Sequence, residues 1–246
     1  MKGQIASEFR KLTTTRSAYW LLAGLLLVVG IGAGSVVGAD EMTTDLSAPL
    51  ERQPFLLFPL TVTTVFTMIL GIRSFTDEFR HGSIVPTLLA SPDRRRVLVS
   101  KLVAVTAASV AYAAAAMGIA LGVGAVALSA KGVGVTWSTA ALADVGGHLV
   151  VASVLWAAIG VGVGLAVRHQ TAAIAGMFVM AMVGESAVAA LLPGIAPYLP
   201  GAAGSAIVGV NAVGLLAPGV AVAVLAGWAA LATVTGERLM QRRDIA

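Results

Sequence analysis

The chain has 246 residues, of which 58% are hydrophobic and only 11% charged, with a mean hydropathy of +0.91 and a formal net charge of +4. Soluble domains carry about 25% charged residues, so this composition excludes an ordinary soluble protein and favours a helical membrane protein. Cysteine is absent, which excludes disulfides and thiolate metal sites.

Residues 1–17 predict an amphipathic helix ahead of the first membrane span. Ile5, Phe9 and Leu12 recur at i, i+4 and i+7, and polar or charged residues occupy the positions between them. A helix of this kind lies in the membrane interface, with its apolar face toward the acyl chains. A plain juxtamembrane basic segment is the alternative interpretation.

Six apolar runs follow, each suited to crossing a hydrocarbon core that takes about 20 helical residues. A signal peptide is the alternative for the first run, because Val37-Gly38-Ala39 resembles a cleavage site, although signal cores span only about 7–15 residues. The predicted fold class is all-α, a polytopic membrane protein with one transmembrane domain over residues 1–246. The spans are expected at about 18–38, 55–75, 97–129, 145–167, 171–192 and 212–236.

The positions of the basic residues orient these spans. With the N-terminus inside, all of the 16 Lys and Arg residues except Arg52 and Lys131 fall on the cytoplasmic side. This is the positive-inside pattern, and the outer loop 39–54 is acidic instead. Both termini are therefore predicted to be cytoplasmic. The basic charge reflects topology, and no nucleic-acid partner is expected.

The connection between spans two and three, residues 76–96, is longer than a hairpin requires. Ser83 is expected to cap a short helix over 84–90, and Ser91-Pro92-Asp93 predicts the start of the third span, with Ser91 as its N-cap. A short helix with charged and apolar side chains suits docking on another protein. A solvated basic loop that only fixes topology is the alternative.

Residues 193–211 are apolar but rich in Pro and Gly, which predicts an outer re-entrant or interfacial segment rather than continuous helix. Glu185 lies within the apolar run of span five. It is a candidate for the substrate pathway, because a charge at membrane depth must face the bundle or water. A position near the wetted outer end of the span is the alternative. For Asp144 and His148, one turn apart at the outer end of span four, a capping or interfacial role is expected, and a ligand site is the alternative.

Pairs of glycines spaced by four residues occur within the predicted spans. Each pair lies on one face of its helix and permits close helix contact. Packing within the bundle or between subunits is expected at Gly30 and Gly34, Gly118 and Gly122, and Gly160 and Gly164.

Several stretches carry a family resemblance. They are Glu8-Phe9-Arg10-Lys11-Leu12 in the entry helix, Glu78-Phe79-Arg80-His81-Gly82-Ser83 after span two, Leu88-Leu89-Ala90-Ser91-Pro92 followed by Lys101, and Tyr198-Leu199-Pro200-Gly201 before the last span. The second is similar to an acid-x-Arg-x-Gly-Thr/Ser element, and the third to a Leu-Leu-x-x-Pro … Lys pattern. In these stretches the chain resembles the permease subunits of ABC exporters of the type-2 family.

The resemblance implies a permease of a bacterial cell membrane. It would work as a dimer with a second copy or a homologue, driven by separate ABC ATPase subunits that bind ATP-Mg. In that family the loop after span two is a coupling helix seated in the ATPase. The resemblance thus implies that Glu78 and Arg80 pair with charges on the ATPase, that Phe79 anchors in its groove and that Gly82 permits a tight turn.

The chain itself is not expected to hydrolyse ATP, because a P-loop needs a Gly-Lys dipeptide and the sequence contains none. It has three histidines and no HExxH motif, so no catalytic residue, metal site or cofactor of its own is predicted. An ATP-independent secondary transporter or channel is the alternative function, and that class predicts more buried charge and internal repeats. A membrane enzyme would need paired acids or Ser/His elements, which are missing.

Overall fold

A computed structural model describes residues 2–38, 54–90, 93–132, 137–209 and 214–242. Within these ranges all regular structure is helical, and six helical stretches are long and apolar enough to cross a membrane. The predicted all-α class and its number of spans are confirmed at this level. The elements are α1 (Lys2–Thr14), α2 (Arg16–Gly38), α3 (Pro54–Arg80), α4 (Ile84–Ala90), α5 (Arg94–Ala130), α6 (Thr139–Val167), α7 (Gln170–Val179), the π-helix η3 (Met180–Gly184), α8 (Glu185–Leu191), the 3-10 helix η4 (Ala196–Tyr198), α9 (Pro200–Ile207) and α10 (Pro218–Arg242).

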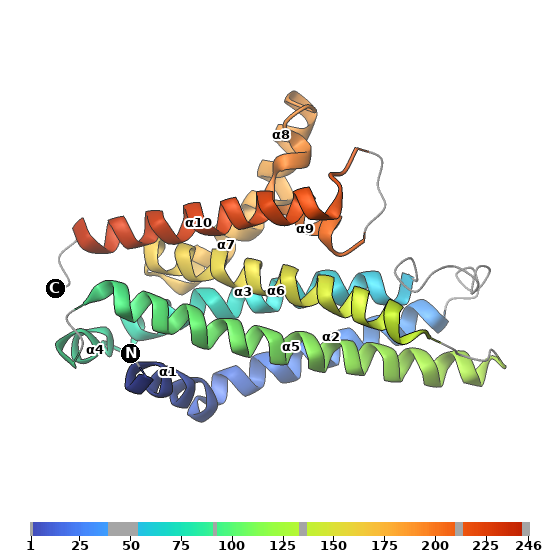
Figure 1. Ribbon diagram of the computed structural model, residues 1–246, viewed down its shortest axis with the longest axis horizontal. Helices are drawn as coiled ribbons and strands as arrows, with labels where there is room; N and C mark the ends of the chain where they lie inside the picture. Colours follow the sequence, from blue (N-terminus) through green and yellow to red (C-terminus); the bar gives the residue numbers. More distant parts are fainter. Residues whose placement is uncertain (1, 39–53, 91–92, 133–136, 210–213, 243–246) are drawn as a thin grey trace.

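The long helices α2, α3, α5, α6 and α10 run side by side (Figure 1), and α7 packs against α3 and α6. Helix α8 projects away from the bundle (Figure 1). Helix α6 lies at the centre and packs against α3, α5 and α10. Helices α1 and α4 and the last turn of α10 lie at one end of the bundle, which we call the basic end (Figure 1). The helix ends with most of the predicted cytoplasmic Lys and Arg residues meet there.

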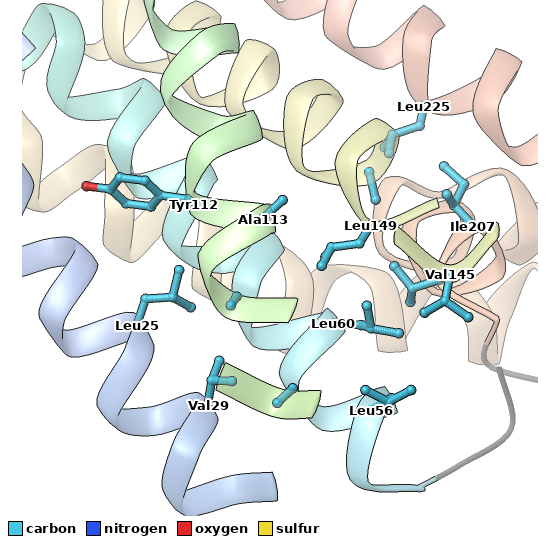
Figure 2. Packing of buried hydrophobic residues seen from close by; sticks show 14 of the residues in the cluster. Leu25, Val29, Leu56, Leu60, Tyr112, Ala113, Val145, Leu149, Ile207 and Leu225 are labelled. Carbon is cyan, nitrogen blue, oxygen red and sulfur yellow. The ribbon is translucent and has the colours of Figure 1, made fainter. Parts of the chain in front are cut away.

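The core consists mainly of aliphatic side chains, and all five long helices contribute to it. A second apolar cluster at the basic end joins α3, α4, α5, α6 and α10. Figure 2 shows part of the main cluster, in which α2, α3, α5, α6, α9 and α10 converge. The labelled members are Leu25, Val29, Leu56, Leu60, Tyr112, Ala113, Val145, Leu149, Ile207 and Leu225.

Glycines bring the backbone of α6 into contact with two neighbouring helices. A Cβ atom added at Gly160 would lie 2.2 Å from the Met68 carbonyl oxygen of α3, and one at Gly162 would lie 2.3 Å from the carbonyl carbon of Ala232 in α10. No side chain fits between these backbones. The predicted role of the Gly160 pair in close helix contact is therefore confirmed within the chain.

The other two glycine pairs differ from each other. Cβ atoms at Gly30 and Gly34 would meet side chains of α5 at 3.6 and 3.5 Å, which is ordinary contact. At Gly118 and Gly122 a Cβ atom would meet nothing within 4 Å in the described part of the chain. The first pair thus packs inside this chain, and the second lies on an open face.

The helix boundaries in the connection between spans two and three correct two predictions. Helix α5 begins at Arg94, and its N-cap is Asp93, whose carboxylate accepts hydrogen bonds from the amides of Arg95 and Arg96. The prediction of Ser91 as N-cap was wrong, since an Asp two residues later satisfies two free amides of the first turn. Helix α3 also continues to Arg80, so the first residues of the predicted loop 76–96 are helical. Helix α4 has the predicted bounds.

The segment before the last span is broken, as its Pro and Gly content predicted. It contains η4 and α9 rather than one continuous helix. Pro200, Ala203 and Ile207 of α9 are buried, and the helix packs against α6 and α10. The buried part of this segment is therefore the regular helix α9, whereas the irregular residues from Leu192 to Tyr198 are exposed or half-buried.

Candidate coupling site at the basic end

The residues singled out after span two occupy the last turn of α3 and the turn that follows it. Glu78, Phe79 and Arg80 are helical, and Gly82 connects α3 to α4 with φ of +67°. That left-handed conformation favours glycine, which has no Cβ atom to clash. The structure therefore gives Gly82 the tight turn expected of it.

Four charged side chains form a compact cluster where α1, α3 and α5 meet. The Lys101 ammonium lies 2.8 Å from Glu8 Oε2 and 2.7 Å from Glu78 Oε1. The Lys11 ammonium lies 2.6 Å from Glu8 Oε1 and 2.6 Å from Glu78 Oε1. Two acids and two bases balance, so the cluster is neutral. We call these four residues the charge cluster.

Burial makes these ion pairs structurally important. Lys101 is 2% exposed, and Glu8 and Glu78 are also buried. Removing a charge from water costs several kcal/mol unless partners compensate it, and here each charge has two. The Phe75 ring, centred 5.1 Å from the Lys101 ammonium, adds a cation–π contact. The cluster thus fixes the entry helix α1 to the ends of two spans.

Glu78 pairs with lysines of its own chain in the charge cluster. The ionic partners that the structure shows for its carboxylate, Lys11 and Lys101, both belong to this chain. Glu78 is therefore a positioning residue that holds the end of α3 against α1 and α5. Its part in binding an ATPase stays a prediction.

The charge cluster also shifts pKa values in α1. Burial alone would raise the pKa of Glu8, but the charges and hydrogen bonds of Lys101 and then Lys11 outweigh it, so the pKa lies below its usual value. Burial alone would lower the pKa of Lys11, but its hydrogen bonds to Glu78 and Glu8 outweigh this, so the pKa is raised.

These two shifts predict a pH window for the docking of α1. A carboxyl group whose pKa is lower in the folded state stabilises the fold at pH values above its unfolded-state pKa, and this stabilisation is lost on acidification. A lysine whose pKa is higher in the folded state stabilises the fold at pH values below its unfolded-state pKa, and this stabilisation is lost in base. Full stabilisation is expected between about pH 4.5 and 10.5. Thermal unfolding of the purified protein from pH 7 to pH 3 should show an acid loss of stability that is smaller in Glu8→Gln. An identical loss in both proteins would contradict the assignment to Glu8.

Phe79 and Arg80 have different environments. The Arg168 guanidinium lies over the Phe79 ring, 5.0 Å from its centroid, and Arg168 caps the end of α6. Phe79 therefore packs the end of α3 against the end of α6. Arg80 is exposed on the surface of the basic end.

Helix α4 lies at the basic end with one side anchored and another side open. Ile84 is 3% exposed and belongs to the second apolar cluster, and the Lys11 ammonium donates a hydrogen bond to Thr87 Oγ1 at 3.5 Å. Val85 and Leu89, one turn apart, are 44% and 79% exposed. This open pair was missed from the sequence, because the apolar spacing within α4 does not reveal which side α3 and α5 cover.

Glu185 has a structural partner far from the basic end. It is the first residue of α8, after the π-helical turn, and its Oε1 atom accepts a hydrogen bond from the Gly201 amide at 2.8 Å. That amide is one of the free donors at the start of α9, where the helix dipole also favours a negative charge. Glu185 thus joins span five to the broken segment. Its part in a substrate pathway stays a prediction.

Asp144 and His148 lie on α6 as the sequence placed them. His148 Nδ1 is 3.5 Å from Asp144 Oδ2, and both side chains are partly or well exposed. The geometry fits a local pair on the helix surface.

No protein-family model matches the chain, and no curated protein matches it. What the basic end does is therefore inferred from its own geometry and chemistry.

Proposed function

We propose that the chain is the permease subunit of an ATP-driven ABC exporter in a bacterial cell membrane. In this proposal both termini are cytoplasmic, the working unit is a dimer with a second copy or a homologue, and ATP-Mg binds separate ATPase subunits. The observation that carries the proposal is α4. It is a short helix outside the spans, and it exposes Val85 and Leu89 beside the helix ends that carry the basic residues.

Coupling to an ATPase requires an element that passes movement into the spans. Helix α4 follows α3 through the turn at Gly82, inserts Ile84 into the second apolar cluster and contacts Lys11 of the charge cluster through Thr87. The charge cluster joins α1, α3 and α5, and α3 packs along the central helix α6. A push on α4 would therefore reach several spans.

The surface of α4 also suits a protein partner. In protein interfaces a few buried anchor side chains carry most of the binding energy, and a polar rim surrounds them. Val85 and Leu89 would be the anchors, and the exposed Arg80 and His81 lie just before them in the chain. Val85 and Leu89 thus offer a small apolar patch with two exposed residues, Arg80 and His81, close to it in the sequence.

Leu89→Ser is expected to remove ATPase binding. Losing an interface anchor costs about 2 kcal/mol or more, which is roughly a thirtyfold rise in Kd. The test is co-purification of the ABC ATPase encoded beside this chain through a tag on the permease, followed by titration of the ATPase onto the purified protein.

Leu191→Ser is the matched control. Leu191 is 78% exposed against 79% for Leu89, but it lies at the end of α8, away from α4. It should leave ATPase binding unchanged. Equal binding by Leu89→Ser and wild type would remove α4 as the docking helix. If no ATPase binds the wild type, the exporter proposal fails and an ATP-independent transporter takes its place.

A further inference from the structure

A cavity of about 610 Å³ opens beside the charge cluster, lined by residues of α1, α2, α3 and α5. One part of its lining is apolar and the other part is charged. Leu12, Leu21, Leu70 and Val105 provide apolar surface, while charged side chains line the rest. A cavity of this size is within the range that holds small amphipathic molecules.

The charges that line this cavity do not balance. Five basic and three acidic side chains contribute to it. Lys11 and Lys101 are paired with Glu8 and Glu78, and Arg73 is paired with Asp77 at 3.1 Å. The remaining two, Arg16 and Arg80, are exposed and make no hydrogen bond or ion pair with the residues that the structure describes. The cavity therefore carries two guanidinium groups in excess.

Glu78, which also lines the cavity, has one buried carboxylate oxygen without a donor in the described residues. Glu78 Oε1 pairs with the ammonium groups of both Lys11 and Lys101. Glu78 Oε2 is buried and accepts no hydrogen bond within the described residues. A buried carboxylate oxygen without a donor is costly. This atom has almost no accessible surface, so a ligand in the cavity would meet the exposed guanidinium groups of Arg16 and Arg80 instead.

We infer that this cavity binds the headgroup of an anionic phospholipid from the adjoining membrane leaflet. The phosphodiester would pair with Arg16 and Arg80, since guanidinium groups match phosphate oxygens with two hydrogen bonds. The apolar surface would take the first part of the acyl chains. Basic pockets between helices at a membrane surface are suited to such headgroups. A free phosphate ion would leave the apolar surface uncovered, so the occupant is a lipid.

The site would fix one lipid between the entry helix and the first three spans of the bundle. It requires only that the spans lie in a membrane and does not depend on ATPase binding. A failed ATPase titration would therefore leave this inference standing, and a failed lipid titration would leave the exporter proposal standing.

The test uses the delipidated, full-length protein in detergent. Dioctanoyl phosphatidylglycerol, dioctanoyl phosphatidylcholine and inorganic phosphate are titrated separately, and bound mass is read by native mass spectrometry alongside the melting temperature. The wild type should retain one phosphatidylglycerol and be stabilised by it. Arg16→Gln/Arg80→Gln should weaken this binding roughly thirtyfold, which is about 2 kcal/mol in total, because each of the two arginines near a membrane surface contributes about half of that.

Arg10→Gln/Arg242→Gln is the matched control. Both arginines are exposed, lie in α1 and the last turn of α10, and do not line the cavity. This variant loses the same charge and should bind phosphatidylglycerol as the wild type does. The single variants Arg16→Gln and Arg80→Gln repeat the test if the double variant is poorly expressed.

Three outcomes would overturn the inference. Equal stabilisation by inorganic phosphate would make the site one for a free anion. Equal binding of phosphatidylcholine would make the lipid contact nonspecific. Equal loss in the two double variants would show that only the overall charge of the basic end matters.

Discussion

Lys101→Met is expected to lower the free energy of unfolding by about 3–5 kcal/mol, the usual cost of removing one partner of a buried ion pair. Lys101 is 2% exposed and contacts both Glu8 and Glu78. Without it, two buried carboxylates share only Lys11. Methionine keeps much of the length of the side chain, so the loss reports the charge rather than a cavity. Unfolding in mixed micelles, followed by circular dichroism, measures it.

Arg96→Gln is the control for this prediction. Arg96 pairs with Asp93 at 2.9 Å, but the two side chains are 63% and 48% exposed. Exposed pairs contribute about 0–1 kcal/mol, so the variant should unfold almost as the wild type does. Adding Glu8→Gln to Lys101→Met should recover part of the loss, because one acid and one base then remain. Equal and small effects of Lys101→Met and Arg96→Gln would mean that the charge cluster does not stabilise the fold.

The spans could be predicted because a hydrocarbon core imposes length and composition on each helix separately. Helix α4 could be predicted as well, since local signals mark its ends. The break in the helical segment before α10 could be predicted from its Pro and Gly content. Each of these features depends on residues close together in the chain.

The charge cluster could not be predicted, since its members lie far apart in sequence. Glu8 and Lys101 are separated by 93 positions, and Lys11 and Glu78 by 67. Each alone fits a common pattern: Glu8 and Lys11 as the polar side of an entry helix, and Lys101 as a headgroup contact. One signal was present. Lys101 is flanked by Val99, Leu102 and Val103, and a lysine in such a run requires an acidic partner.

Glu185 illustrates the same limit. The sequence left two interpretations open, a group in the substrate pathway and a group near the wetted end of the span. Its partner, the Gly201 amide, lies 16 positions away. The contact arises because the chain turns back after α8 and starts a new helix against α6 and α10. The spacing of residues in the sequence does not reveal that the chain turns back after α8.

Gly160→Ala is expected to be among the most damaging of the conservative substitutions in the spans. The new Cβ atom would lie 2.2 Å from the Met68 carbonyl oxygen and 3.0 Å from the Ile72 amide nitrogen. Both are backbone atoms of α3, which no rotamer change can move aside. The helices must separate, and overpacking of this kind costs about 1–3 kcal/mol or more. Gly71→Ala tests the same contact from α3, where the Cβ atom would lie 2.1 Å from the Ala157 carbonyl oxygen.

Gly118→Ala separates packing from helix propensity. Gly118 lies inside α5, and an added Cβ atom there would meet nothing within 4 Å among the described residues. Alanine should therefore stabilise that helix by roughly 0.5–1 kcal/mol. Micelle unfolding of the three variants should place Gly118→Ala at or above the wild type, and Gly160→Ala and Gly71→Ala well below it. Equal behaviour of Gly160→Ala and Gly118→Ala would mean that α3 and α6 are not in backbone contact. The central packing of the bundle, through which a push on α4 would reach α6, would then have to be different.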